Sequence, residues 1–334
     1  MDAKPVVAVT MGDPAGIGSE VVVKSFEAAR EHARPVVVGD VSVMTDAVRV
    51  CGSDLEIGPV DSVEAGLAVE DAIPVLDLGN VGDLEYGVVR EDYGRASLEY
   101  VETAIDLAIV GTVDAIATAP INKQATRLAG AEHAGHTGLL AARTGTEDYS
   151  MMLIEEPLRV THVSTHVPLR EACDLVTAAS VGSTVDVTHD ALLDLGIGEP
   201  SIAVAGLNPH ASDGGLMGEE DDAEIRPAVE AARERGIDVH GPESPDTVYV
   251  RAAGGEFDCV VSMYHDQGHI PIKMLGFGSD GAVSGVNVTV GLPIVRTSVD
   301  HGTAFDIAGE GVASETSMVD AVRIAAQLAA ARKG

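Results

Sequence analysis

Three histidines follow the ends of three apolar, strand-like segments of the chain. The segments cover residues 158–165, 201–207 and 258–263, and the histidines that follow them are His166, His210 and His265. In an open α/β sheet, ligands bind beyond the carboxyl ends of the strands. Neutral imidazoles brought together there would bind a divalent transition metal and leave coordination positions for a substrate. The pattern therefore predicts a metal-dependent active site.

The spacing of these histidines leaves a second interpretation open. It matches no local zinc motif, and a lone histidine at a strand end is commonly a hydrogen-bonded turn residue. Two other histidines illustrate this role. His162 lies inside a strand-like segment and His189 inside a helix-like one, and both are interpreted as structural.

Two more strand-like segments, residues 5–10 and 114–118, lead into MGDPAGIG (11–18) and APINK (119–123). The glycines of the first motif fit neither the dinucleotide fingerprint GxGxxG nor a Walker A loop. We therefore expect a tight strand-to-helix crossover there and no ordinary Rossmann site. Lys123 in the second motif is a weaker candidate for binding an anion.

Strand and helix patterns alternate along the chain, which predicts an α/β fold with a mostly parallel sheet and flanking helices. A helix is expected from Ser19, as its N-cap, to about Ala33. Further helices are expected over residues 97–110, 137–143, 177–195, 219–235 and 315–332. A length of 334 residues is sufficient for two domains.

The chain is strongly acidic, with 53 Asp and Glu against 21 Lys and Arg and a net charge of −32. The acidic residues are spread along the whole chain, which indicates a surface adapted to high salt, where self-repulsion is screened. Nucleic acid and anionic membranes are excluded as partners because they require clustered basic residues. Three cysteines without a pairing pattern, and no signal peptide or transmembrane run, predict a cytoplasmic protein.

Eight motifs, in order, resemble those of the 4-hydroxythreonine-4-phosphate dehydrogenase (PdxA) family. They are GDPAGIGSE (12–20), APINK (119–123), GHT (135–137), THVPLR (165–170), GLNPHASDGG (206–215), PDT (245–247), YHDQG (264–268) and GLPIVRTSVDHGTAFDIAG (291–309). The resemblance implies two α/β/α domains like those of isocitrate and isopropylmalate dehydrogenases, with the active site in the interdomain cleft of a homodimer. Residues 1–134 with 296–334 would form the first domain, which carries a C-terminal NAD loop. Residues 135–295 would form the second, with the metal ligands and the dimer interface.

The resemblance also implies roles for individual residues. The metal ligands would be His166, His210 and His265, with one subunit lending His265 to His166 and His210 of the other. Substrate contacts would be His136, Thr137, Lys273, Asn287 and Arg296. The segment from Asp300 to Gly311 is similar to the NAD-binding loop of isopropylmalate dehydrogenase, and its cofactor contacts would be Asp300, His301, Gly302, Thr303, Asp306 and Gly309.

The catalytic candidates are Lys273, Asp246 and Asp266. For the two aspartates, orientation of ligands, proton transfer and an ordinary role in turns all stay open. The implied cofactors are NAD or NADP and one divalent metal per site, which could be Zn, Mg, Mn or Co.

Three departures indicate a branch of the family. Gly138 replaces the glutamate of the usual GHTE, Met274–Val286 is longer than expected, and His269 with Ile270 resembles the form that oxidises 4-phospho-D-threonate or 4-phospho-D-erythronate. We therefore expect NAD- and metal-dependent oxidation and decarboxylation of such an acid. The alternatives are the dehydrogenase of pyridoxal phosphate synthesis itself, a phosphate acyltransferase, a metal-dependent hydrolase or isomerase without NAD, and a non-catalytic metabolite-binding protein.

Overall fold

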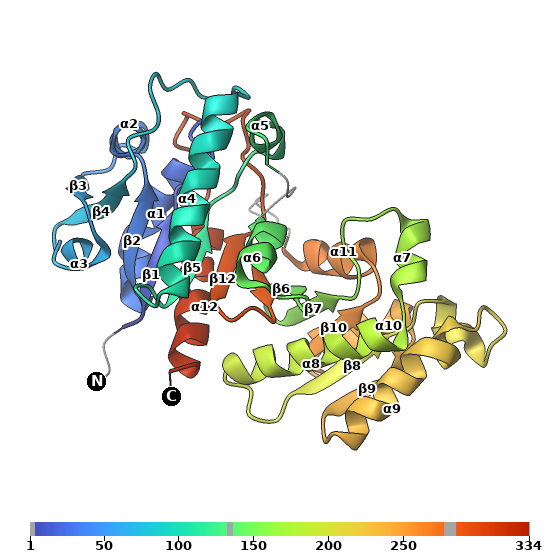
Figure 1. Ribbon diagram of the computed structural model, residues 1–334. Coiled ribbons are helices and arrows are strands. Elements are labelled where there is room, and N and C mark those ends of the chain that lie inside the picture. Colours follow the sequence, from blue (N-terminus) through green and yellow to red (C-terminus); the bar gives the residue numbers. More distant parts are fainter. Residues whose placement is uncertain (1–3, 132–135, 277–284, 334) are drawn as a thin grey trace. The chain divides into compact units, whose positions relative to one another are not determined.

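The computed structural model describes residues 4–131, 136–276 and 285–333. The chain forms two compact units, Met1–Gly145 with Pro293–Gly334 and Thr146–Leu292 (Figure 1). The first unit extends to Gly145, beyond the expected boundary at residue 134, because helix α6 (His136–Thr144) packs against helix α4 (Glu91–Ile109). The expected second boundary at 295/296 lies at 292/293 in the structure.

The first unit contains a parallel sheet in the order β3-β4-β2-β1-β5-β12. Its strands are β1 (Val6–Thr10), β2 (Arg34–Gly39), β3 (Glu56–Val60), β4 (Ala72–Asp77), β5 (Ala115–Thr118) and β12 (Val295–Val299). Its other helices are α1 (Gly18–His32), α2 (Val41–Val50), α3 (Val63–Gly66), α5 (Lys123–Leu128) and α12 (Thr316–Ala331). The C-terminal helix α12 packs on β12, β5 and α1 (Figure 1).

The second unit contains a mixed sheet in the order β11-β6-β7-β10-β8-β9, in which β6 is antiparallel to both neighbours and the other pairs are parallel. Its strands are β6 (Ser150–Glu155), β7 (Leu158–His162), β8 (Ser201–Ala205), β9 (Asp238–Glu243), β10 (Cys259–Ser262) and β11 (Val286–Val290). Its helices are α7 (Leu169–Leu175), α8 (Ala178–Asp194), α9 (Arg226–Glu234), α10 (Pro245–Ala253) and α11 (His265–Gly276). A 3₁₀ segment covers Pro209–Asp213, and one π turn, Asp221–Ile225, precedes α9.

Apolar strands covered by helices form the core, as expected for an α/β fold. In the second unit, Leu153, Val160 and Val260 of the sheet pack with Val248 and Tyr249 of α10. The expected fold class, α/β with mostly parallel sheets, is confirmed. In the described ranges, no helix is both long and apolar enough to cross a membrane.

The ends of several elements differ from those expected. Ser19 is not the N-cap of α1, because the helix already begins at Gly18 and Ile17 occupies the cap position without a side-chain hydrogen bond. The strand expected over 158–165 ends at His162, and the helix expected over 97–110 begins at Glu91. Helix α8 begins as expected after Thr177, whose side chain forms a capping box with Ser180.

Candidate functional site

The three predicted ligand histidines follow three neighbouring parallel strands. His166 follows β7, His210 follows β8, and His265 opens α11 directly after β10, which lies between the other two strands. The rings of His166 and His265 have centroids 5.5 Å apart. The strand arrangement therefore places all three histidines at one edge of the sheet, as the sequence predicted.

His265 is held from two sides. Its Nδ1 atom lies 2.6 Å from Asp266 Oδ1, and its ring stacks on that of His269 with centroids 3.6 Å apart. His269 Nδ1 in turn lies 3.2 Å from Nε2 of the buried His162, and burial lowers the pKa of His162 to about 3. The interpretation of His162 as a structural histidine agrees with this buried position. With Nδ1 facing a carboxylate, Nε2 of His265 is the nitrogen that suits a metal.

His210 lies in a strained turn. Its φ is 54°, and the φ values of Ala211 and Ser212 are also positive, which is unusual for residues with a side chain. His210 Nδ1 lies 3.5 Å from Asp246 Oδ2 and 3.5 Å from Ser244 Oγ. As at His265, a carboxylate therefore faces Nδ1, an arrangement typical of histidines that bind a metal through Nε2.

The structure groups His166 with His265, and His210 with Asp246, within one chain. The expected sharing, in which His166 and His210 belong to one chain and His265 comes from its partner, stays a prediction. Within the described part of a single chain, no three His, Cys, Asp or Glu side chains converge as a metal site. Two imidazoles oriented by carboxylates nevertheless fit a divalent transition metal, because such metals prefer nitrogen ligands.

Two of the predicted substrate contacts in the first unit, Arg296 and His136, are close enough to interact electrostatically. This arginine of β12 is buried, its Nη2 donates to Thr118 Oγ1 over 2.7 Å, and burial lowers its pKa to about 9. The pKa of His136 lies well below its ordinary value because of burial and the positive charges of Arg296 and Lys123. His136 is therefore neutral at pH 7 in a region of positive potential, which suits a phosphate or carboxylate.

Two predicted substrate contacts carry buried atoms that are ready for a ligand. His136 Nε2 in the first unit and Asn287 Oδ1 in the second have no hydrogen-bond partner among the described residues. Buried polar atoms are normally paired, so unpaired ones favour a site that a ligand completes. Thr137 follows His136 in the first turn of α6, and Lys273 lies on α11 two turns after His265.

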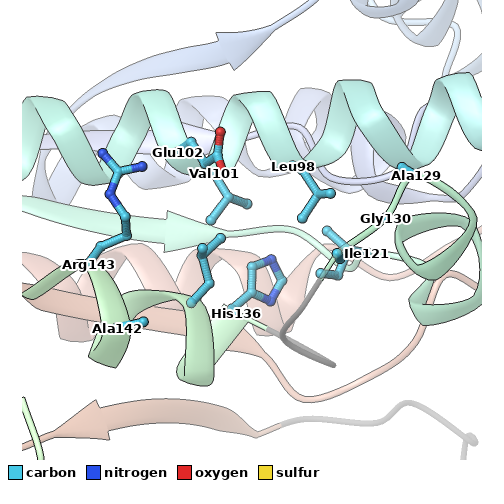
Figure 2. Close-up of a pocket in the computed structure, with 11 residues that line it drawn as sticks. Leu98, Val101, Glu102, Ile121, Ala129, Gly130, His136, Ala142 and Arg143 are labelled. Carbon is cyan, nitrogen blue, oxygen red and sulfur yellow. The ribbon is translucent and has the colours of Figure 1, made fainter.

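A cavity of about 500 Å³ lies beside His136 in the first unit (Figure 2). Its walls come from α4, α6 and the segments just before and after α5, and they are mostly apolar, with Leu98, Val101 and Ile121 around the His136 ring. Arg143, which lines it, is paired with Asp106. His136 is the single predicted substrate residue in its lining. A mostly apolar cavity of this kind is a poor site for a phosphorylated acid.

The predicted cofactor loop, Asp300–Gly311, is well packed at both ends. Ile17 N donates to Thr303 O over 3.0 Å, and the amides of Gly309 and Gly311 donate to the carboxylate of Glu20. Asp306 lies between these anchors and is exposed. His301 Nδ1 lies 3.0 Å from Gly302 O. An exposed carboxylate on a fixed loop fits the hydroxyl groups of a ribose.

Some residues of functional interest were not predicted from the sequence. Asp13, in the GDPAGIG turn, is fully buried, and its Oδ1 accepts from Ala15 N, while its Oδ2 has no partner among the described residues. Glu20 and Asp221 were also missed as residues that hold parts of the site. Each lies inside or close to a recognised motif, so a search of those motifs and their flanks for carboxylates would have found them.

Comparison with known proteins agrees with these motifs. The profile of the family described as "Pyridoxal phosphate biosynthetic protein PdxA" matches residues 31–325. The chain is similar to the D-threonate 4-phosphate dehydrogenase of Cupriavidus necator, with 46% identity over 99% of both chains. It is also similar to the 4-hydroxythreonine-4-phosphate dehydrogenase of Desulforapulum autotrophicum, with 43% identity over 97% of this chain and 96% of that one. The crystal structure of 4-hydroxythreonine-4-phosphate dehydrogenase from Klebsiella pneumoniae covers 98% of this chain and 99% of that one, with 42% identity and a TM-score of 0.86.

Proposed function

The chain belongs to the PdxA family, and on that basis we propose that it oxidises and decarboxylates D-threonate 4-phosphate or D-erythronate 4-phosphate with NAD. The observation that carries the proposal is the set of three histidines after adjacent parallel strands, two of them backed by carboxylates. Relatives named for D-threonate 4-phosphate and for 4-hydroxythreonine 4-phosphate both match nearly the whole of this chain.

In the proposed reaction, C3 of the acid transfers its hydrogen as a hydride to NAD⁺ and the hydroxyl on C3 loses a proton, which gives a β-keto acid and NADH. The bond between C1 and C2 then breaks, CO₂ leaves, and C2 takes up a proton. The product from either acid is dihydroxyacetone phosphate.

The substrate's anionic groups would be held by Arg296, Lys273, Asn287, Thr137 and neutral His136. Arg296 offers a planar, bidentate donor, and its burial strengthens each contact with an anion. Two cations, Arg296 and Lys123, act on His136 and lower its pKa. A substrate hydroxyl is therefore better placed near His136 than an ammonium group, which favours the hydroxy acids over 4-hydroxythreonine 4-phosphate.

His166, His210 and His265 would hold one divalent metal, with Zn²⁺, Co²⁺ or Mn²⁺ better suited than Mg²⁺ to nitrogen ligands. When bound, such a metal polarises the substrate's hydroxyl and carbonyl oxygens and stabilises negative charge on them. Asp266 and Asp246 would orient His265 and His210 through their Nδ1 atoms. This contact favours an orienting role for both aspartates over proton transfer, and leaves Lys273 as the candidate acid–base residue.

The site would be shared within a homodimer. His210 does not join His166 and His265 in the described part of one chain, so we propose that it completes the ligand set of the partner subunit. Apolar side chains are exposed near these residues, with Leu169, Leu216, Ile270 and Met274 each more than half exposed. Exposed apolar side chains of this kind are typical of a surface that another subunit covers.

The proposed cofactor is NAD in preference to NADP. Asp306 would accept hydrogen bonds from the adenosine ribose, and residues 300–313 contain no Lys or Arg to bind a 2′-phosphate. Exposed Asp306 would instead repel that phosphate.

The test is a spectrophotometric assay of the purified protein with NAD, Mn²⁺ or Zn²⁺ and D-threonate 4-phosphate. We expect NADH and CO₂ in equal amounts, loss of turnover with a chelator, and recovery when metal is added back. D-threonate without its phosphate is the control and should react poorly. Phosphate release, isomerisation or acyl transfer without NADH would overturn the proposal in favour of a hydrolase, isomerase or acyltransferase.

A further inference from the structure

We propose that Glu20 is a positioning residue for the predicted cofactor loop, Asp300–Gly311, and that the GDPAGIGSE segment holds this loop in place. The inference rests on the proposed NAD-binding role of the loop. It gives a function to a motif that resembles a phosphate loop but does not match one. All the residues involved lie in the first unit.

Glu20 is fully buried in the first turn of α1, and each of its carboxylate oxygens accepts one backbone amide of the loop. Gly309 N donates to Oε1 over 2.6 Å, and Gly311 N donates to Oε2 over 2.8 Å. A single carboxylate therefore fixes two amides that are two residues apart. A carboxylate at this place is also favoured by the partial positive charge of the helix N-terminus.

The same carboxylate disfavours binding of a phosphate by the motif, because its negative charge lies in the first turn of α1. In phosphate loops, the free amides at a helix N-terminus point at the anion. In this chain, the acidic group in the first turn of α1 belongs to the protein and is engaged with the loop. The glycines then serve the packing of backbone against backbone. A Cβ added to Gly16 would lie 2.9 Å from Thr303 Cβ, so only glycine allows the loop to approach this closely.

Gly309 and Gly311 are equally constrained on the loop side. Their φ values are 87° and 71°, a region that favours glycine. A Cβ added to Gly309 would lie 2.8 Å from the ring of Tyr86, and one added to Gly311 would lie 2.6 Å from Val50 O. The backbone of the loop is thus packed tightly on one side while Glu20 holds its amides.

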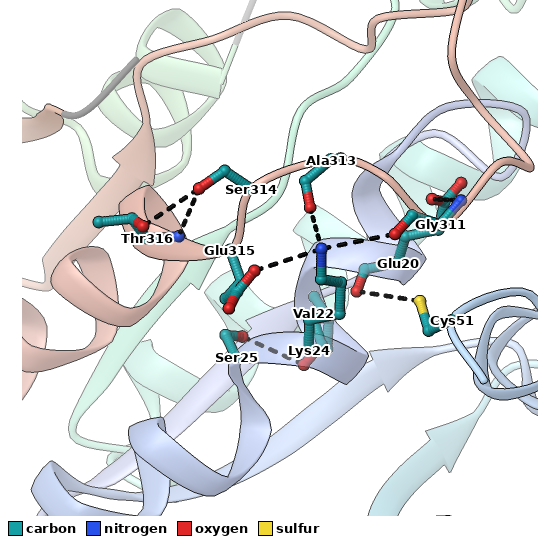
Figure 3. A network of polar contacts seen from close by, with 10 residues as sticks. All are labelled: Glu20, Val22, Lys24, Ser25, Cys51, Gly311, Ala313, Ser314, Glu315 and Thr316. Carbon is teal, nitrogen blue, oxygen red and sulfur yellow. Dashed lines mark hydrogen bonds and ion pairs between the residues drawn. The ribbon is translucent and has the colours of Figure 1, made fainter. Parts of the chain in front are cut away.

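Lys24, one turn after Glu20, extends this anchor (Figure 3). Its Nζ donates to Ala313 O, lies 3.5 Å from Gly311 O, and forms an ion pair of 3.3 Å with Glu315. At the other end of the loop, Ile17 N donates to Thr303 O. The segment from Ile17 to Lys24 therefore fixes both ends of the loop, and exposed Asp306 is carried between them. Fixing the loop in advance lowers the entropy lost when a cofactor binds.

The test compares Glu20→Gln with Glu27→Gln, a matched change at a partly exposed glutamate on the same helix, which pairs with Arg30. A glutamine keeps the size of the side chain but offers one acceptor, and its NH₂ group would face an amide donor. Hydrogen exchange in the protein without cofactor should become faster at Gly309 and Gly311 in Glu20→Gln only. The Kd of NADH, measured by titration, and the KM of NAD should rise by about tenfold, the equivalent of one lost buried hydrogen bond. The kcat at saturating NAD and the metal affinity should stay unchanged.

Unchanged exchange at Gly309 and Gly311 would show that Glu20 does not hold the loop. Faster exchange with an unchanged Kd for NADH would overturn the positioning role. If wild-type protein does not bind NADH, the NAD assignment itself fails and the positioning role falls with it, while the exchange comparison still decides whether Glu20 anchors the loop. Should Glu20→Gln not fold, Lys24→Met removes only the Nζ contacts, and it should give the same changes at smaller size; no change in either readout would again overturn the proposal.

Discussion

The hydroxyl of Ser212 donates a hydrogen bond to Asp221 Oδ2 over 2.5 Å, and both side chains are fully buried. The same carboxylate accepts Leu207 N at 2.8 Å and Asn208 N at 3.2 Å. One aspartate therefore holds the turn on both sides of His210. A left-handed backbone at a residue with a side chain persists only where the surroundings fix it, and Asp221 provides that constraint.

The first prediction concerns this carboxylate. Asp221→Asn places an amide NH₂ among donors, so we expect a loss of about 1–3 kcal/mol of stability for the unsatisfied buried donor. Metal affinity should fall by about 10- to 100-fold because His210 loses its fixed orientation. Metal titration and thermal unfolding check both effects. Asp222→Asn, at a partly exposed residue bonded to Arg226, is the control, and an equal loss of metal affinity there would contradict a specific role for Asp221.

The second prediction concerns how subunits share the histidines. His210→Ala should abolish turnover and sharply weaken metal binding while the fold survives, because a metal ligand is lost. Mixing inactive His210→Ala and His265→Ala proteins should then restore about a quarter of the activity, since about half of the exchanged dimers are mixed and each carries one intact site. Activity after subunit exchange is the measurement.

A second mixture identifies which histidines come from the same chain. His166 and His265 lie together in one chain, so His166→Ala mixed with His265→Ala should restore no activity. Recovery in this mixture would show that His265 is the ligand supplied by the partner. No recovery in either mixture, with exchange of subunits demonstrated, would show that each site is built within one chain.

The third prediction concerns pH. Burial raises the pKa of Asp13 from 3.8 to about 6, although the amide of Ala15 opposes this rise. A group with a raised folded-state pKa stabilises the fold below its unfolded pKa, and this contribution is lost as the pH rises through about 6. The loss amounts to at most about 3 kcal/mol. Asp13→Asn should therefore gain stability relative to the wild type between about pH 4 and pH 7.

Chemical unfolding over this pH range measures the difference for Asp13→Asn. Asp54→Asn, at an exposed site, is the control. The stability difference between Asp13→Asn and wild type could instead be constant with pH, or fall as the pH rises. Either result would show that the pKa of Asp13 is not raised in the folded protein.

The fourth prediction concerns salt. With 53 acidic and 21 basic residues, stability should rise substantially from low to molar NaCl as repulsion among the acids is screened. Most of the ion pairs are at least partly exposed, so the loss of their attraction in salt should be small. A melting temperature that is flat or falls over this range would contradict the interpretation of the acidic excess as an adaptation to salt.

The sequence predicted the parts of the fold that have local signatures. Apolar strands such as β1 and the capped helix α8 were identified because burial and capping leave patterns in neighbouring residues. The end of β7 and the start of α4 were misplaced. His162 and Thr165 are both compatible with a strand, and the start of α4 has no side-chain cap to mark it.

The site was predicted less completely because its chemistry depends on contacts between distant segments. The positions of the three histidines at strand ends could be predicted from periodicity, but their grouping could not, because it depends on the order of β7, β10 and β8. Glu20 is 289 residues from Gly309, which it holds, and nothing local indicates that pairing. The buried Asp13 was overlooked because glycines dominate its motif.

The most direct test of the account is the ratio of kcat/KM for D-threonate 4-phosphate and 4-hydroxythreonine 4-phosphate, measured as NADH formation with NAD and a saturating divalent metal. The positive charges of Arg296 and Lys123 act on His136, and Gly138 offers no carboxylate beside it for a substrate ammonium. We therefore predict a preference of about 100-fold or more for the hydroxy acid. An equal or higher kcat/KM with the amino substrate would contradict the account and assign the chain to the synthesis of pyridoxal phosphate.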